Sequence, residues 1–215
     1  MRYDAVMFDL DGTLADTLRD LAEAANHALT TVGRPTNPLD AYRTLTGQGL
    51  DRLIGDAMGL DHQQLFKKAV EAFHDHYAQH RYDHCTPYPG IPELLDALTA
   101  RGVRLAVMSN KPNEATVDMV ERIFGRWKFA AVRGHRAGYP VKPDPKAALD
   151  TCSELCVPPE RWAYIGDTDV DMHTGRSAGF FTVGVAWGFR PVQGMRAAGA
   201  NAIIDQPSEL LPLIR

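Results

Sequence analysis

The chain has 215 residues, of which 23 are Lys or Arg and 27 are Asp or Glu, giving a formal net charge of −4 with His neutral. Apolar residues make up 45% of the sequence and charged residues 23%, which excludes wholesale disorder. A slightly negative net charge does not indicate the basic surface that nucleic-acid binding requires. No apolar run is long enough to cross a bilayer. We therefore expect one large domain, or a core domain carrying a smaller one, that binds neither nucleic acid nor membranes.

The cysteines and the N-terminal residues indicate the compartment. Three cysteines are too few for a disulfide framework, and the first residues soon include acids and do not have the layout of a secretion signal. Cys152 and Cys156 lie four residues apart on an expected helix, but no second pair completes a metal site, so we interpret them as free thiols. These features predict a reducing, cytoplasmic setting.

The N-terminal part of the chain combines one strand pattern with several helical patterns. Residues 3–8 form a short apolar run ended by acids and a glycine, which predicts a buried strand. The helical patterns that follow cover about 17–31, 40–45, 50–58 and 61–80. Between residues 15 and 85 there is no convincing strand pattern, so this segment is predicted to be a helical insert.

Strands and helices alternate after Pro87-Tyr88-Pro89-Gly90, a group of turn-forming residues. Strand patterns are found at 103–108, 129–133, 162–165, 181–185 and 202–204. Helical patterns are found at 91–100, 113–124, 145–156 and 169–178, and a short helix is expected at the C-terminus. This alternation predicts an α/β fold whose parallel sheet is covered on both faces and includes the first strand.

Four polar clusters follow or lie near expected strands. They are Asp9-Leu10-Asp11-Gly12-Thr13, Ser109-Asn110-Lys111-Pro112, Lys142-Pro143 and Gly166-Asp167-Thr168-Asp169-Val170-Asp171. Because ligands of open α/β sheets bind outside the carboxyl ends of the strands, one parallel sheet would bring all four clusters to the same edge. Taken alone, each cluster is also compatible with a turn, a helix cap or a surface loop. Their joint order along the chain favours a site.

The residue types in these clusters suit phosphoryl transfer. Carboxylates are ligands that Mg²⁺ prefers, and the cation offsets the repulsion between an anionic nucleophile and a phosphate. A hydroxyl and free amides at a helix start can hold phosphate oxygens, while a lysine stabilises developing negative charge. One aspartate can attack phosphorus, and a second aspartate two residues on can protonate the leaving oxygen and later deprotonate a water.

These motifs resemble those of the haloacid dehalogenase superfamily, in its phosphatase branch, over nearly the whole chain. The first motif is matched by Phe8-Asp9-Leu10-Asp11-Gly12-Thr13-Leu14, and the other three clusters match the second, third and fourth motifs. The resemblance implies a Rossmann-like parallel sheet core, formed by residues 1–14 and 86–215, with an inserted helical cap at residues 15–85. Asp11 argues against dehalogenase chemistry, because that branch lacks the second aspartate.

The resemblance also implies roles for single residues. Asp9 would be the nucleophile and a Mg²⁺ ligand, and Asp11 the general acid and base, whose backbone carbonyl would also bind Mg²⁺. Asp167 would be the third protein ligand of the metal. Lys142 would bridge the phosphate and Asp9, and Asp171 would orient Lys142 or a metal-bound water.

The second motif and the cap would bind the substrate. By the same resemblance, Ser109 and the backbone amide of Asn110 hold the phosphate, with Lys142. Residues 87–90, the second motif and the cap loop Thr46-Gly47-Gln48-Gly49 are similar to the phosphoglycolate phosphatase subfamily. The implied reaction is Mg²⁺-dependent hydrolysis of a small phosphorylated metabolite, 2-phosphoglycolate, through an aspartyl phosphate on Asp9.

Other functions share much of this pattern. Pyrophosphatases, nucleotidases and sugar phosphomutases of the same superfamily are the alternatives for the activity. A binding protein that keeps only the scaffold is a further alternative, because a fold does not guarantee a function, although such a protein would be expected to lose reactive residues that are intact here. For the assembly, we expect a monomer or a homodimer.

Overall fold

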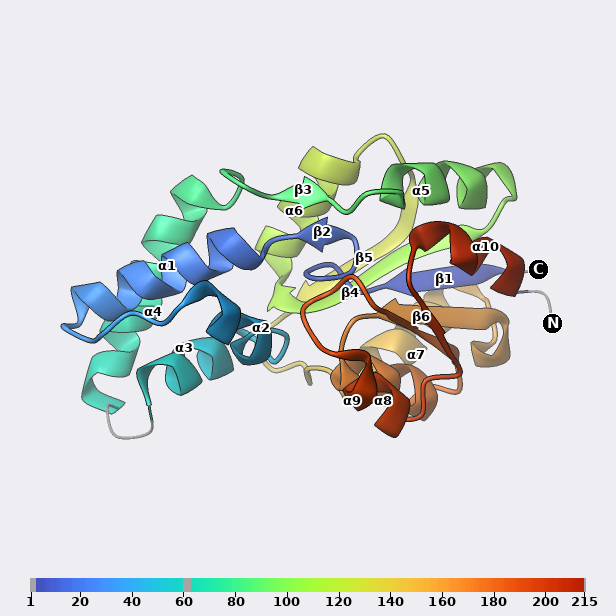
Figure 1. Cartoon of the computed structure of the whole chain (residues 1–215). Coiled ribbons are helices and arrows are strands. Elements are labelled where there is room, and N and C mark those ends of the chain that lie inside the picture. Colours follow the sequence, from blue (N-terminus) through green and yellow to red (C-terminus); the bar gives the residue numbers. More distant parts are fainter. Residues whose placement is uncertain (1–2, 60–62, 215) are drawn as a thin grey trace.

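The computed structural model describes residues 3–59 and 63–214. Its centre is a six-stranded sheet with the order β5-β4-β1-β6-β7-β8, in which all neighbouring strands run parallel. The strands are β1 (Ala5–Phe8), β4 (Arg104–Pro112), β5 (Phe129–His135), β6 (Trp162–Gly166), β7 (Phe181–Val185) and β8 (Ala202–Ile204). Helices flank the sheet, and a separate group of helices lies beyond one end of it (Figure 1).

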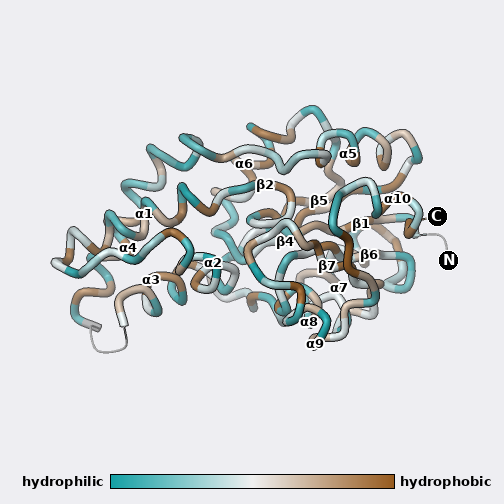
Figure 2. Tube along the Cα trace, viewed as in Figure 1, coloured by the Kyte–Doolittle hydropathy of each residue, from teal (hydrophilic) through white to brown (hydrophobic). Residues whose placement is uncertain are grey.

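The first strand occupies the middle of the sheet. It pairs with β4 on one side and with β6 on the other, and all of its residues are buried. Val6 and Phe8 pack into one apolar cluster, whereas Ala5 and Met7 pack into a second cluster. Because successive side chains of a strand point to opposite faces, a strand that is apolar throughout must be covered on both faces. Figure 2 shows the hydrophobic residues concentrated in these central strands.

Two layers of helices cover the sheet. The helical elements are α5 (Ile91–Ala100), α6 (Asn113–Phe124), α7 (Lys146–Leu155), α8 (Asp169–Ser177), α9 (Val192–Ala197) and α10 (Leu210–Leu213), with 3₁₀ turns η2 (Pro159–Arg161) and η3 (Pro207–Glu209). Apolar residues of α5, α6 and α10 join the cluster of Val6 and Phe8, and those of α7 join the cluster of Ala5 and Met7. The predicted α/β fold with a parallel sheet is therefore confirmed.

The inserted helices form a second unit, which we call the cap. It contains α1 (Leu18–Thr31), η1 (Leu39–Ala41), α2 (Tyr42–Leu45), α3 (Leu50–Met58) and α4 (Gln63–His80). Their apolar faces share a core cluster separate from those of the sheet, in which Leu29, Tyr42 and Ile54 are fully buried. The single helix predicted at 40–45 is divided between η1 and α2, and the predicted start of α4 at Asp61 lies outside the described residues.

Two short strands hold the two connections between core and cap side by side. The first, β2 (Ala15–Asp16), pairs antiparallel with β3 (Thr86–Pro87), and the Tyr88 amide donates a hydrogen bond to the Leu14 carbonyl over 3.0 Å. The prediction that residues 15–85 contain no strand is therefore wrong at β2. A strand of two residues is too short for any alternation of apolar and polar side chains, so the sequence carries no signal of it.

Strand β4 runs further than its apolar pattern predicts. The apolar run ends at Met108, but the strand continues through Ser109 and Asn110 to Pro112, with a shift of register against β5 on the way. Its last side chains are polar because they line a cavity instead of packing into the core. The second motif is therefore the end of a strand, and no side chain caps the start of α6.

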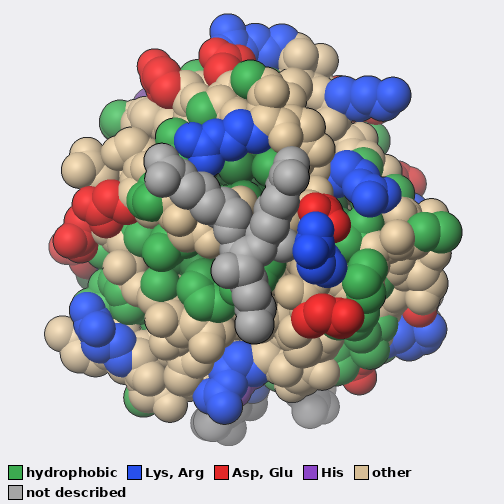
Figure 3. All heavy atoms as spheres, turned by 90° about the vertical axis from the view of Figure 1, so that its right-hand side faces the viewer, with side chains coloured by type: hydrophobic (Ala, Val, Ile, Leu, Met, Phe, Trp, Pro, Cys, Tyr) green, Lys and Arg blue, Asp and Glu red, His purple; other side chains and the backbone are tan. Residues whose placement is uncertain are grey.

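The surface away from the cap is mixed in charge. Figure 3 shows the end of the molecule at which both termini lie, where basic and acidic side chains are interspersed around the rim. Among the described residues, no helix has both the length and the apolar character needed to span a membrane.

Candidate active site

A cavity of about 380 Å³ lies between the carboxyl ends of the strands and the cap. On the core side, the strand ends and loops contribute the polar residues Asp9, Asp11, Ser109, Asn110, Lys111 and Lys142. Pro112 and the α6 residues Glu114, Ala115 and Asp118 complete this side. On the cap side, α1, α3, α4 and the loop before α3 contribute mostly apolar residues. The parallel sheet thus brings the first three motifs to one edge, as the sequence predicts.

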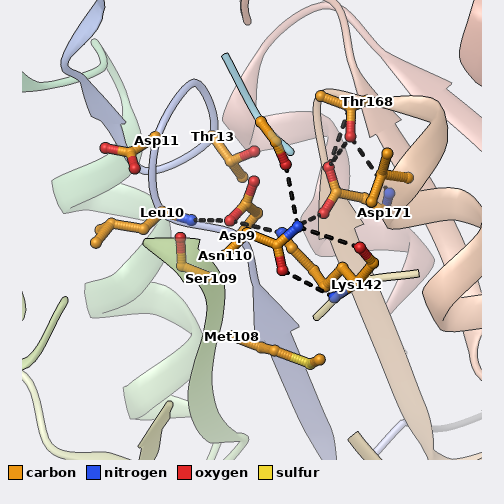
Figure 4. Close-up of polar contacts among 12 residues, drawn as sticks. Asp9, Leu10, Asp11, Thr13, Met108, Ser109, Asn110, Lys142, Thr168 and Asp171 are labelled. Atoms are coloured by element: carbon orange, nitrogen blue, oxygen red, sulfur yellow. Dashed lines mark hydrogen bonds and ion pairs between the residues drawn. The ribbon is translucent and has the colours of Figure 1, made fainter. Parts of the chain in front are cut away.

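Lys142 is the centre of the polar network drawn in Figure 4. Its Nζ lies 2.8 Å from Asp9 Oδ1 and 2.7 Å from Asp171 Oδ1. Asp9 Oδ1 also accepts a hydrogen bond from the Leu10 amide over 2.7 Å. Asp171 in turn accepts from the hydroxyl of Thr168 over 2.7 Å, so that the start of α8 holds the carboxylate that holds Lys142. The lysine and both aspartates are buried, which fixes their positions relative to one another.

Asn110 connects the end of β4 to the loop that carries Lys142. Its Oδ1 accepts from the Lys142 amide over 2.8 Å, and its Nδ2 donates to the Lys142 carbonyl over 3.2 Å. The same Nδ2 donates to the carbonyl of Gly47 in the cap over 3.2 Å. Neighbouring Ser109 is buried and lines the cavity, where its hydroxyl accepts from the Lys111 amide over 3.3 Å.

Asp167 joins Asp9 and Asp171 in a buried acidic cluster. One carboxylate oxygen from each of the three lies within 4.8 Å of the others. Burial raises the pKa of Asp9 to about 7, although Lys142 lowers it, and burial with the charges of Asp171 and Asp9 raises the pKa of Asp167 well above its usual value. Lys142 alone cannot neutralise three carboxylates, and oxygen ligands of this kind fit a hard divalent cation such as Mg²⁺ or Ca²⁺.

The backbone approaches Asp167 closely on two sides. Gly12 has a φ of 83°, and a Cβ atom there would lie 2.4 Å from Asp167 Oδ2, so only glycine fits this turn of the first motif. The amide of Phe189 donates to the same Oδ2 over 2.7 Å. Phe189 belongs to the core sequence, but its side chain packs into the apolar cluster of the cap. Asp167 therefore lies at a junction between the two units.

Asp11 stands apart from the network that joins Asp9, Lys142 and Asp171 (Figure 4). Its carboxylate accepts from the Thr17 hydroxyl over 2.7 Å and from Lys111 Nζ over 3.0 and 3.1 Å. Lys111 belongs to the second motif, but no role for it could be predicted from the sequence. Its position between Asn110 and Pro112, in a cluster already predicted to belong to the site, is the one feature of the sequence that could have indicated a role.

The comparison with protein families decides the classification. Residues 6–185 match the family described as haloacid dehalogenase-like hydrolases. The chain belongs to this family. As a haloacid dehalogenase-like hydrolase, it combines a Rossmann-like sheet with an inserted helical cap, which confirms the fold that the motifs implied.

Several relatives of this haloacid dehalogenase-like hydrolase are named as phosphatases. It is 33% identical to a phosphoglycolate phosphatase of Pseudomonas putida, over 96% of this chain and 78% of that protein. It is 32% identical to an N-acetylmuramic acid 6-phosphate phosphatase of Pseudomonas aeruginosa, over 100% of this chain and 96% of that protein. A crystal structure described as a candidate phosphoglycolate phosphatase of Lactobacillus delbrueckii superposes with a TM-score of 0.90 at 31% identity, covering 100% of this chain and 99% of the other. Two relatives with similar sequence identity to this chain are named for different phosphate monoesters, so sequence identity alone does not determine the substrate.

Proposed function

We propose that the chain is a Mg²⁺-dependent phosphatase that hydrolyses 2-phosphoglycolate through an aspartyl phosphate on Asp9. The observation that carries this proposal is the buried contact of Lys142 with Asp9, at the floor of a cavity that is open to a small substrate. A lysine fixed 2.8 Å from a carboxylate can attract a phosphate to that carboxylate and stabilise the charge of the transferring group. The names of the relatives support phosphate monoesters as the substrate class.

The first half of the reaction forms the aspartyl phosphate. The Leu10 amide and Lys142 Nζ both contact Oδ1 of the Asp9 carboxylate, so we assign Oδ2 as the attacking atom. Its lone pair forms the new bond to phosphorus, and the bond from phosphorus to the leaving oxygen breaks. Protonated Asp11 donates its proton to that oxygen, which departs as an alcohol. Ser109, the Asn110 amide and Lys142 hold the phosphate oxygens during the transfer.

The second half releases phosphate. Asp11, now a carboxylate, takes a proton from a water molecule, and the oxygen of that water forms a bond to phosphorus as the bond to Asp9 breaks. This sequence regenerates the Asp9 carboxylate and the protonated Asp11, so atoms and charges balance over one turnover. Lys142 contacts Asp9 throughout and is itself oriented by Asp171.

Asp9, Asp167 and the backbone carbonyl of Asp11 are the ligands that we propose for Mg²⁺. The fit rests on the excess negative charge of the buried acidic cluster and on the raised pKa values of Asp9 and Asp167. When bound, the cation would offset the repulsion between the attacking carboxylate and the phosphate.

We further propose that residues 1–14 and 86–215 act as the catalytic core and residues 15–85 as a cap that closes over the substrate. The pairing of β2 with β3 supports two adjacent hinges, because both chain crossings lie there. The proposal includes a cytoplasmic enzyme, monomeric or homodimeric, that acts on a small metabolite and not on nucleic acid. The three cysteines support a reducing setting, since Cys85, Cys152 and Cys156 are free thiols.

A substrate panel tests the proposal. Phosphate release is measured with and without Mg²⁺ for 2-phosphoglycolate, N-acetylmuramic acid 6-phosphate, pyrophosphate, hexose phosphates and nucleoside monophosphates. We expect Mg²⁺-dependent release with the highest kcat/KM for 2-phosphoglycolate. A higher kcat/KM for another monoester would keep the phosphatase mechanism and overturn the substrate. Isomerisation of a hexose phosphate in the presence of a bisphosphate, without release of phosphate, would indicate a mutase instead.

A further inference from the structure

The cap side of the cavity contains a buried hydroxyl that nothing in the described part of the chain satisfies. Tyr77 lies on α4, is only 6% exposed and lines the cavity. Its hydroxyl oxygen is buried and has no hydrogen-bond partner among the described residues. Burial of a hydroxyl without a partner is unfavourable, so its place on a cavity wall indicates a group of the substrate as the missing partner.

Lys111 lies next to this hydroxyl on the opposite wall. Its side chain is buried, and its Nζ is 4.9 Å from the centre of the Tyr77 ring. Its Nζ forms an ion pair with the Asp11 carboxylate at 3.0 Å, and this contact favours the charged ammonium. An ammonium has three donors. Among the described residues, Lys111 Nζ donates hydrogen bonds to the two oxygens of Asp11 and also interacts electrostatically with Tyr77.

The proposed reaction fixes where the rest of a small substrate must lie. Asp11 has to reach the leaving oxygen of the monoester to protonate it. In 2-phosphoglycolate, the carboxylate oxygens are separated from that leaving oxygen by two carbon atoms, and therefore by about 3 Å. Whenever Asp11 is ionised, as it is after it has donated its proton, it would repel a carboxylate so close to it unless a cation stood between them. Lys111 Nζ, 3.0 Å from Asp11, is in that position.

We propose that Lys111 Nζ and the Tyr77 hydroxyl form a subsite for a carboxylate on the leaving group, which makes the enzyme selective for short phosphorylated hydroxy acids. The inference rests on the proposed phosphatase function and specifies its substrate class. Leu21, Leu53 and Phe73 line the same cavity, and their apolar surfaces strengthen the attraction between ammonium and carboxylate by excluding water.

Arg81 is the competing cation on the cap side. It also lines the cavity, and its Nε is buried without a partner among the described residues. However, its Nη2 is held by Asp118 at 2.9 Å, and Arg81 directly follows the last residue of α4, about 6 Å further along the helix axis than Tyr77. A carboxylate bound by Arg81 would suit a longer leaving group than that of 2-phosphoglycolate.

The test compares two substrates that differ only in the carboxylate. The kcat/KM values for 2-phosphoglycolate and for ethyl phosphate are measured with the wild type, Tyr77→Phe, Lys111→Met, Arg81→Gln and the control Lys68→Met, whose lysine is exposed on α4. We expect the ratio of the two values to fall roughly 10- to 100-fold in Tyr77→Phe and in Lys111→Met. The ratio should stay at the wild-type value in Lys68→Met. Tyr77→Phe removes only a hydroxyl, so it keeps the test valid if Lys111→Met disturbs Asp11 or fails to fold.

The outcomes separate this subsite from the proposed function. If the wild type prefers 2-phosphoglycolate but neither Tyr77→Phe nor Lys111→Met changes the ratio, the subsite is wrong and the function stands. A ratio that falls only in Arg81→Gln places the carboxylate further from Asp11 and also overturns the subsite. Hydrolysis of neither compound by folded, Mg²⁺-loaded wild type would overturn the proposed function, and the subsite with it.

Discussion

The two sides of the active-site cavity are built differently. On the core side, Lys142, Asp171 and Asn110 hold one another through short contacts, and all are buried. On the cap side, apolar residues surround polar atoms such as the Tyr77 hydroxyl that have no partner within the described chain. A network that is satisfied before the substrate arrives is preorganised for one chemical step. Donors without a partner on a separate unit can instead provide selectivity, because only a substrate with a suitably placed acceptor can form hydrogen bonds with them.

The largest effect is expected on the core side, for Asp9→Asn. The amide cannot serve as the nucleophile, so we expect kcat to fall on the order of 10³-fold or more for every substrate in the panel. Acid-quenched enzyme should also lose its hydroxylamine-labile phosphate. Circular dichroism would verify that the variant is folded. Turnover close to that of the wild type would show that Asp9 is not the nucleophile and that the core side does not carry the reaction.

Lys142→Met would break the centre of the core-side network. The substitution leaves Asp9 and Asp171 buried without their shared cation, and breaking a buried ion pair in this way costs about 3–5 kcal/mol of unfolding free energy. Denaturant unfolding in the absence of Mg²⁺ measures this loss. Lys146→Met is the matched control, because its ion pair with Asp150 is exposed and contributes about 0–1 kcal/mol. Equal losses in the two variants would contradict the view of a tightly coupled core side.

The core side is also the part that the sequence predicted best. Parallel strands must present their carboxyl ends at one edge, so the motifs containing Asp9, Ser109 and Lys142 could be placed together without knowing a single side-chain contact. The parallel direction of the strands and the burial of the first strand followed from the same alternation of strands and helices. The residues of these motifs line one cavity in the structure.

What the sequence could not predict are contacts between distant side chains. Lys111 and Asp11 are 100 residues apart, and their ion pair depends on the continuation of β4 beyond its apolar run. Tyr77 fits a helical apolar pattern like any core residue, and only its place on the cavity wall reveals the hydroxyl. Phe189 lies in the core sequence but packs in the cap, because packing follows distance in space and not order in the chain.

Phe189→Ala tests the junction between the two sides. Removal of a buried phenyl ring from the apolar cluster of the cap should cost about 3 kcal/mol of unfolding free energy. Because the Phe189 amide donates to Asp167, we also expect weaker Mg²⁺ binding by calorimetry. Leu39→Ala, at an exposed apolar residue of the cap, serves as the control and should change stability by less than about 0.5 kcal/mol. An unchanged Mg²⁺ affinity would show that the cap and the acidic cluster are independent.

The pH dependence of stability tests the excess charge of the core side. In the metal-free protein, burial raises the pKa of folded Asp9 to about 7, whereas the carboxyl of the unfolded chain has its ordinary pKa of 3.8. Between these values the folded state binds the extra proton, so its stability falls as the pH rises, by as much as about 1.4 kcal/mol per pH unit, and the fall ends above about pH 7. We expect wild type to lose more stability than Asp9→Asn between pH 5 and pH 8 by thermal unfolding.

Addition of Mg²⁺ should reverse this loss, because the cation binds the ionised cluster. We therefore expect Mg²⁺ to raise the Tm of the wild type more at pH 8 than at pH 5. Identical pH profiles for the wild type and Asp9→Asn without metal would mean that Asp9 is ionised in the folded protein, and that Lys142 alone compensates the cluster.

The smallest effect is expected at the contact that joins the two sides, Arg190→Gln. Arg190 extends from the core loop after β7, and its Nη2 donates to the carbonyls of Thr44 and Thr46 in the cap over 2.6 and 3.2 Å. Loss of these bonds should loosen the cap loop that begins at Thr46 and borders the cavity. Because this loop lines the cavity and contains none of the residues that we propose as catalytic, we expect KM to rise about three- to tenfold while kcat changes less. Arg136→Gln, at an exposed arginine outside the cavity lining, should leave KM unchanged. A fall in kcat at constant KM would instead mean that the cap loop acts on the transition state. In that case the cap side would contribute to the chemical step as well as to substrate binding.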